Sequence, residues 1–133
     1  MVRPTRRQQI PQLQEAIKET AWRQIAETGA AALSLRSIAR ELGITAPAIY
    51  NYFPRRDDVV TALIVDAYTL LGDSQKSTLE SVSKKDAATR FSALGIAYRD
   101  WAVTYPQRYQ LIFGTPIPNY DAPEDTTTPA AAC

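Results

Sequence analysis

Histidine is absent from this chain of 133 residues, and cysteine occurs once, at Cys133. The lack of histidine removes the commonest zinc ligand and any catalytic triad of the Ser-His-Asp type. A lone cysteine has no partner for a disulfide within the chain. The few glycines form no phosphate-binding loop. We therefore expect no metal, no cofactor and no enzymatic activity.

Long hydrophobic runs are also missing. No stretch of about eighteen apolar residues occurs, which is the length that a membrane-spanning helix needs. The N-terminal segment VRPTRRQQIP is basic and lacks the apolar centre of a signal peptide. These absences predict a soluble, cytoplasmic protein that does not bind a membrane.

Charge is nearly balanced over the whole chain, at +1, but it is divided unevenly. Residues 1–56 contain nine basic and four acidic side chains, a formal charge of +5. Residues 57–133 contain six basic and ten acidic ones, a formal charge of −4. A basic part joined to an acidic part favours a nucleic-acid reader with a regulatory partner domain.

Residues 34–53, SLRSIARELGITAPAIYNYF, have the pattern of two short helices joined by a tight turn. Ser34 is a candidate N-cap, and apolar residues follow it at positions 35, 38, 39 and 42, which is helical spacing. Gly43 can adopt the positive φ that ends a helix. Thr45 can cap the second helix, and Pro47 is tolerated in its first turn. The segment predicts a helix-turn-helix, which places side chains in the major groove of DNA.

The second helix of this pattern has an inner and an outer side. Ile49 and Phe53 lie four residues apart and are expected to face inward. Small alanine methyls let the backbone approach bases, Thr and Asn can hydrogen-bond to base edges or phosphates, and tyrosine hydroxyls can reach phosphates. The outer residues are Thr45, Ala46, Ala48, Tyr50, Asn51 and Tyr52. The alternative is an ordinary α-hairpin in which the tyrosines are half-buried packing residues.

Three stretches together resemble the N-terminal domain of the tetracycline-repressor (TetR) family of bacterial transcription factors. They are IKETAWRQIAETG (17–29), the segment 34–53, and PRRDDV (54–59). The resemblance implies an all-α protein, with a three-helix DNA-binding head followed by the first helices of a helical-bundle regulatory domain. It implies that residues 45–52 enter the major groove, and that Arg56 stands where the family usually has a phosphate-binding lysine. The candidate DNA-binding residues are Arg36, Thr45, Ala46, Pro47, Ala48, Tyr50, Asn51, Tyr52 and Arg56.

Two residues depart from the pattern of the family. Gln24 stands where a large apolar residue is more usual, and Arg55 stands where a Ser, Asn or Asp cap of the fourth helix is usual. Asp57 and Asp58 in the first turn of that helix can offset the loss of the cap by complementing the helix dipole.

Three domains are expected along the chain. Residues 1–10 form a basic arm, whose Arg3, Arg6 and Arg7 either touch DNA or remain a solvated tail. Residues 11–71 form the DNA-binding domain: its first helix runs from about Pro11 to Thr28, and its fourth begins near Asp57 and weakens at Gly72. Residues 72–133 form an incomplete ligand-binding and dimerisation domain that ends in a Pro-rich loop.

An aromatic stripe marks the second half of the chain. Aromatic residues recur at spacings of three and four after the polar connection 81–90, and Pro106 is expected to end one helix and open the next. They either line a small-molecule pocket or form ordinary core packing. The candidate ligand-binding residues are Tyr98, Trp101, Tyr105, Tyr109 and Phe113. The run 98–116 also resembles the start of one group of TetR-type C-terminal domains.

From Thr115 onward the chain is rich in proline and threonine and predicts a loop. Family members continue with further helices, including the pair that forms the dimer interface. The chain is therefore expected to be a fragment or to assemble differently, with an apolar face left uncovered.

These observations predict a sequence-specific DNA-binding transcriptional regulator that is a repressor released by a small-molecule effector. Its partners would be a palindromic double-stranded DNA operator and, in the full-length protein, a second copy in a homodimer. The alternative is a helical ligand-binding or protein-interaction module in which the helix-turn-helix is only scaffold.

Overall fold

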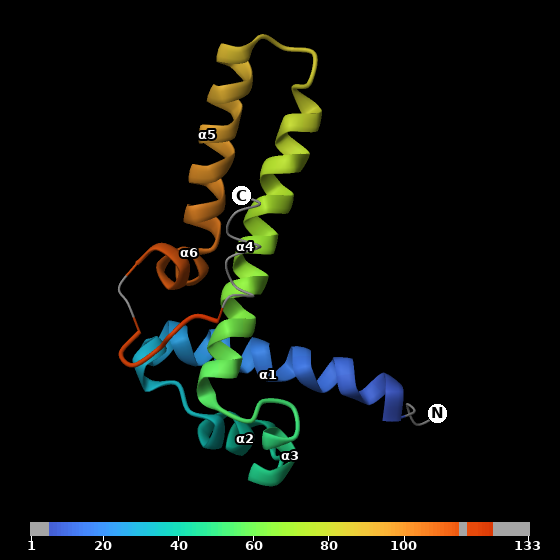
Figure 1. Ribbon diagram of the computed structural model, residues 1–133, viewed down its shortest axis with the longest axis vertical. Coiled ribbons are helices and arrows are strands. Elements are labelled where there is room, and N and C mark those ends of the chain that lie inside the picture. The colour runs from blue at the N-terminus through green and yellow to red at the C-terminus, as the bar shows by residue number, and fades with distance from the viewer. Residues whose placement is uncertain (1–5, 115–116, 124–133) are drawn as a thin grey trace. The chain divides into compact units, whose positions relative to one another are not determined.

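The computed structural model describes residues 6–114 and 117–123, with side chains from Pro11 onward. All regular structure in these ranges is helical (Figure 1). Its elements are α1 (Arg6–Thr28), the 3₁₀ turn η1 (Ala30–Ala32), α2 (Leu35–Leu42), α3 (Ala46–Tyr50), α4 (Arg56–Ser81), α5 (Ala87–Thr104) and α6 (Pro106–Phe113). The all-α class expected from the sequence is confirmed.

The chain forms two compact units that divide within α4, between Ala62 and Leu63. We call residues 6–62 the head and residues 63–114 the body. The domain boundary expected between Leu71 and Gly72 lies inside the continuous helix α4, where Gly72 is buried.

Helix α1 begins at Arg6, five residues before the start expected at Pro11. Proline fixes φ near its helical value and gives up only its own N–H, so one helical turn can precede it. The expected arm is therefore helical from Arg6 onward, and Arg3 lies outside the described residues. Helix α1 ends before Gly29, which has a φ of +84°.

Each helix of the head contributes apolar side chains to its core. Ile17 and Ala21 of α1, Ile38 of α2 and Ile49 of α3 are completely buried. The first turns of α4 add Val59 and Val60, which are also completely buried. The head therefore has a hydrophobic core built at the helical spacing that the sequence shows.

The turn between α2 and α3 follows the local chemistry of its residues. The Ser34 hydroxyl accepts a hydrogen bond from the Ser37 N–H at 3.2 Å and caps α2. Gly43 adopts a left-handed φ of +66°, and the Ile44 N–H bonds back to the Ala39 carbonyl at 3.0 Å. This pattern ends α2 sharply and turns the chain toward α3.

Helix α3 is shorter than expected, since it ends at Tyr50 and the residues up to Phe53 form a turn. Thr45 caps it by accepting a hydrogen bond from the Ala48 N–H at 3.3 Å. Pro54 disfavours the helical conformation for the residue before it, which explains why Phe53 lies outside the helix. Phe53 is nevertheless buried, as its spacing from Ile49 predicted.

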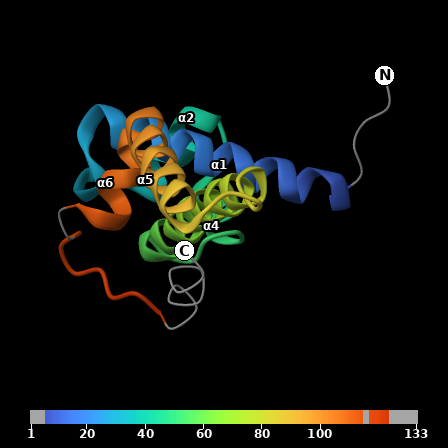
Figure 2. The same ribbon diagram turned by 90° about the horizontal axis from the view of Figure 1, so that it is seen from above.

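The body contains an antiparallel hairpin of the 63–81 part of α4 with α5, seen in Figures 1 and 2. The Gln75 side-chain amide donates to the Leu94 carbonyl across this pair at 3.4 Å. Asp86 caps α5 by accepting the Thr89 N–H at 2.7 Å, so the connection expected over 81–90 is shorter and α5 begins at Ala87. Pro106 opens α6, as predicted.

In the described ranges, none of the helices combines the length and the apolar character needed to cross a bilayer. Those residues also contain no group of three or more acidic or cysteine side chains placed to hold a metal ion.

Candidate nucleic-acid interface

Helix α3 points one side chain into the core and leaves the others toward solvent. Ile49 is completely buried, whereas Tyr50 is 41% exposed. Thr45, Pro47 and Asn51 are exposed, and Ala46, Ala48 and Tyr52 are half-buried. The outer face expected for the segment 45–52 is therefore present in the structure. DNA contact by these residues remains a prediction.

Arginines from two helices meet at a surface groove beside α3. The groove has a volume of about 420 Å³, and Ser34, Arg36, Tyr50, Pro54, Arg55 and Arg56 are among the residues that line it. The groove thus combines the capped N-terminal end of α2, the start of α4 and the last residue of α3. Three guanidinium groups near a helix N-terminus favour the binding of anions.

Arg56, a candidate phosphate contact, has protein partners at both ends of its guanidinium group. Its Nη1 donates to the Ala31 carbonyl in η1 at 3.3 Å. Its Nε lies 3.6 Å from an Asp57 carboxylate oxygen, and the side chain is 29% exposed. Arg56 therefore ties the start of α4 to η1 within the head.

The side chain of Arg55, unlike that of Arg56, extends into solvent. The Arg55 backbone N–H donates to the Asp58 carboxylate at 2.9 Å, which is the reciprocal half of a capping box, whereas the arginine side chain has no acceptor for the first N–H groups of α4. The Arg55 Nε lies 3.6 Å from the same carboxylate, and the side chain is 77% exposed. Asp58, three positions later, therefore satisfies the backbone N–H of Arg55 at the start of α4.

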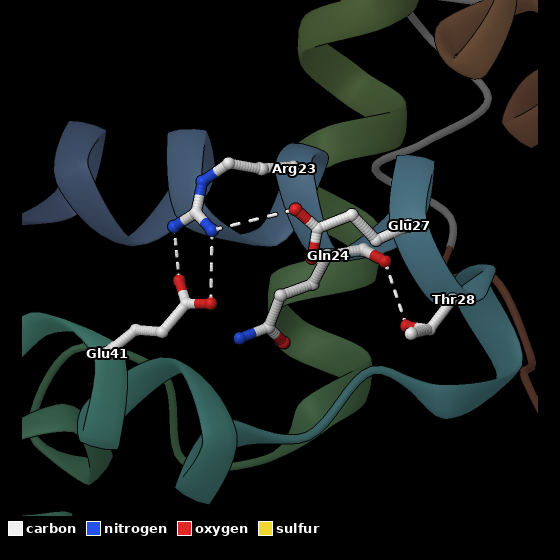
Figure 3. A network of polar contacts seen from close by, with 5 residues as sticks. All are labelled: Arg23, Gln24, Glu27, Thr28 and Glu41. Carbon is white, nitrogen blue, oxygen red and sulfur yellow. Dashed lines mark hydrogen bonds and ion pairs between the residues drawn. The ribbon is translucent and has the colours of Figure 1, made fainter.

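An ion pair between Arg23 of α1 and Glu41 of α2 braces the helix-turn-helix (Figure 3). Arg23 Nη1 donates to Glu41 Oε1 at 3.0 Å, and Nη2 pairs with Oε2, which makes the contact bidentate. The hydrogen bond from Arg23 lowers the pKa of the Glu41 carboxyl below its ordinary value. Arg23 also lies 4.0 Å from Glu27 of its own helix.

Gln24 lies beside this ion pair and is buried (Figure 3). Its side-chain Nε2 makes no hydrogen bond. The Gln24 backbone carbonyl accepts from the Thr28 hydroxyl at 2.9 Å. An unsatisfied buried donor costs stability, and this donor stands where the family pattern has an apolar residue.

The five candidate ligand-binding aromatics of the body fall into two groups. Tyr98, Tyr109 and Phe113 pack in tilted and edge-to-face pairs with ring centroids 5.4–6.2 Å apart, and the Tyr68 ring of α4 lies edge-to-face 5.9 Å from Phe113. Burial raises the pKa of the Tyr98 hydroxyl, and its hydrogen bond with Tyr109 acts in the same direction.

The second group contains Trp101 and Tyr105, with ring centroids 5.8 Å apart. The Arg108 guanidinium lies 5.0 Å from the centre of the Tyr105 ring. Trp101 is only 4% exposed, and its indole N–H makes no hydrogen bond. These rings pack together and one buried donor among them makes no hydrogen bond, and ligand binding by these residues remains a prediction.

Two family models match separate parts of the sequence. The model of bacterial regulatory proteins of the tetR family matches residues 17–63, and that of the tetracyclin repressor-like C-terminal domain matches residues 91–133. The chain belongs to the TetR family. The resemblance seen in the sequence, including that of the run 98–116 to a C-terminal domain, is confirmed.

Several proteins similar to this TetR-family chain are named as regulators. The HTH-type transcriptional regulator Rv1816 of Mycobacterium tuberculosis is 40% identical over 126 residues, which are 95% of this chain and 54% of that protein. The crystal structure of SCO4313 has a TM-score of 0.86 and 45% identity, and covers 97% of this chain and 61% of its own. The structure of a Rhodococcus sp. RHA1 protein of unknown function has a TM-score of 0.76 and 25% identity. The match covers 90% of this chain and 61% of that protein chain. The chain thus spans about half the length of the curated relatives it matches.

Sequence reasoning missed two features of this site. The Arg23–Glu41 pair joins residues eighteen positions apart, and no local rule connects them. The exposed groove position of Arg55 was also missed. Its signal was present, because an arginine at a capping position cannot cap and must place its charge elsewhere.

Proposed function

We propose that this chain is the DNA-reading part of a sequence-specific transcriptional regulator of the TetR family. The observation that carries this proposal is the orientation of α3, where Ile49 alone is buried and its neighbours face solvent. A homodimer would place two such helices in successive major grooves of a palindromic operator. The protein works in the cytoplasm and is not an enzyme.

The side chains on the outer face of segment 45–52 differ in length and in the DNA groups that they can contact. Ala46 and Ala48 are small and half-buried, so they allow a close approach of the helix to base edges and thymine methyls. Thr45 uses its hydroxyl to cap the helix, which leaves Asn51 as the exposed amide for base or phosphate contacts. Tyr50 and Tyr52 contact the DNA backbone through their hydroxyls.

The regulatory part of the proposal is repression released by a small-molecule effector. Its support is the aromatic content of the body and the unsatisfied indole N–H of Trp101. An effector with apolar rings and a hydrogen-bond acceptor would match this chemistry. A thermal-shift screen tests it, because compounds that stabilise the chain should also lower its DNA affinity. Stabilising compounds that leave DNA affinity unchanged would count against release by ligand.

Selection of bound duplexes from a random pool tests the DNA-binding proposal. We expect an enriched, palindromic site, and weaker binding to all sequences by Tyr50→Phe, because it removes a hydroxyl and keeps the ring. Ala48→Val should instead change the preferred bases. Tyr105→Phe in the body is the matched control and should change neither the overall DNA affinity nor the preferred bases. Absence of any enriched site, with equal binding by Tyr50→Phe and wild type, would refute the assignment.

A further inference from the structure

The groove between α2 and α4 contains three arginines whose surroundings differ. Arg36 and Arg55 are exposed, whereas Arg56 is 29% exposed and has partners at both ends of its guanidinium group. Tyr50 belongs both to the groove and to the outer face of α3. An anion in the groove would therefore lie next to the surface proposed to read DNA bases.

We propose that this groove binds a phosphate of the DNA backbone through Arg55 and Arg36, and that Arg56 instead braces the head. This inference rests on the proposed DNA-binding function. It differs from the expectation drawn from the family pattern, which places the phosphate contact at the position of Arg56.

Geometry separates the roles of the two adjacent arginines. The Arg55 side chain is 77% exposed, and its carboxylate partner lies near Nε, so both terminal nitrogens remain available as a fork for phosphate oxygens. Arg56 uses Nη1 for the Ala31 carbonyl, a contact with a residue 25 positions away. This contact holds Arg56 against the head and leaves fewer of its N–H groups for a phosphate than Arg55 has.

The Asp58 cap makes the division possible. Because Asp58 accepts the Arg55 N–H, the backbone at the start of α4 is held in place without a capping side chain at position 55. Position 55 can then carry a cation at the edge of the groove. Arg36 is exposed on the first turn of α2 and reaches the same groove from the other helix. Arg36 and Arg55 both line the groove, and their guanidinium groups can donate to the two non-bridging oxygens of a phosphate diester, which carries one negative charge.

The salt dependence of duplex affinity distinguishes these roles, because each neutralised phosphate adds about 0.9 to the slope of log K against log salt concentration. We would measure fluorescence anisotropy of a selected duplex with wild type, Arg55→Ala, Arg36→Ala and Arg56→Ala. Arg40→Ala is the matched control, since Arg40 is exposed on α2 and is not among the residues that line the groove. Thermal denaturation of each variant reports its effect on folding.

Arg55→Ala and Arg36→Ala should each reduce the slope by about 0.9 per head and weaken binding about tenfold, with an unchanged Tm. Arg55→Lys should keep the slope because it keeps the charge. Arg56→Ala should lower the Tm and change the slope less than Arg55→Ala does. The inference is overturned if Arg55→Ala behaves like Arg40→Ala, or if Arg56→Ala gives the largest loss of slope. A wild-type chain that binds no duplex at low salt would overturn the proposed function as well.

Discussion

Ile49 in the head is completely buried, whereas Ile96 on α5 of the body is 60% exposed. Phe91 and Val103 on the same helix are more exposed still, at 80% and 66%. Trp101 is the buried residue of α5. The head thus encloses a hydrophobic core between its helices, whereas the body exposes apolar surface of the kind that marks an interaction site.

The two regions differ in charge as they do in packing. The net charge of residues 1–56 is positive, and the net charge of the residues that follow is negative. This comparison teaches that DNA contact can be analysed within the head, where the helices, caps and groove belong to one compact unit.

The largest expected effect comes from one substitution made in both regions. Ile49→Ala should destabilise the protein by about 2–5 kcal/mol, because it opens a cavity in the head core. Ile96→Ala should change stability by less than about 0.5 kcal/mol. Urea denaturation of both variants measures the difference. A comparable loss for Ile96→Ala would break the comparison and show that the exposed face of α5 is covered in solution.

A smaller effect of opposite sign is expected at Gln24. Gln24→Leu should stabilise the protein by about 1 kcal/mol, because it removes a buried donor that makes no hydrogen bond. Gln12→Leu is the control, since Gln12 is exposed on the same helix. The free energy of unfolding of both variants checks this. Destabilisation by Gln24→Leu would mean that the amide stabilises the folded protein although its Nε2 makes no hydrogen bond.

The smallest effects concern one carboxylate in each region. The pKa of Glu41 in the head is below its ordinary value of 4.5 because of the hydrogen bond from Arg23. The pKa of Asp86 in the body is below 3.8 because it accepts hydrogen bonds from Thr89. A carboxyl whose pKa is lowered in the folded protein stabilises the fold at pH values above its ordinary pKa. This stabilisation is lost as pH falls through the lowered pKa.

Glu41→Gln and Asp86→Asn should therefore lower the Tm at pH 7, and the difference from wild type should vanish as pH falls below the lowered pKa of each carboxyl. Thermal denaturation over this range, repeated with Glu15→Gln as an exposed control on α1, is the measurement. A deficit that stays constant with pH would show that shape and not charge is responsible.

Local chemistry made the helix-turn-helix predictable from the sequence. Ser34, Gly43 and Thr45 act through bonds to neighbours within five residues, and all three have the roles that their side chains predicted. Pro106 opens α6 for the same reason, since its fixed φ suits a first turn.

What could not be predicted depends on residues distant in the chain or on competing preferences. Pro11 favours a helix start, but the helix extends one turn before it. Gly72 disfavours a helix interior, yet α4 continues through it and it is buried there. The bond from Arg56 to Ala31 exists only once η1 and α4 are folded together.

The central claim is that the outer face of α3 docks on duplex DNA and that the body does not. Methyl NMR of alanine and isoleucine, recorded as a selected duplex is added at low salt, tests it most directly. The account predicts that the Ala46 and Ala48 methyl signals shift and that those of Ile96 stay in place. Shifts confined to Ile96 and the body alanines, with α3 unaffected, would contradict it.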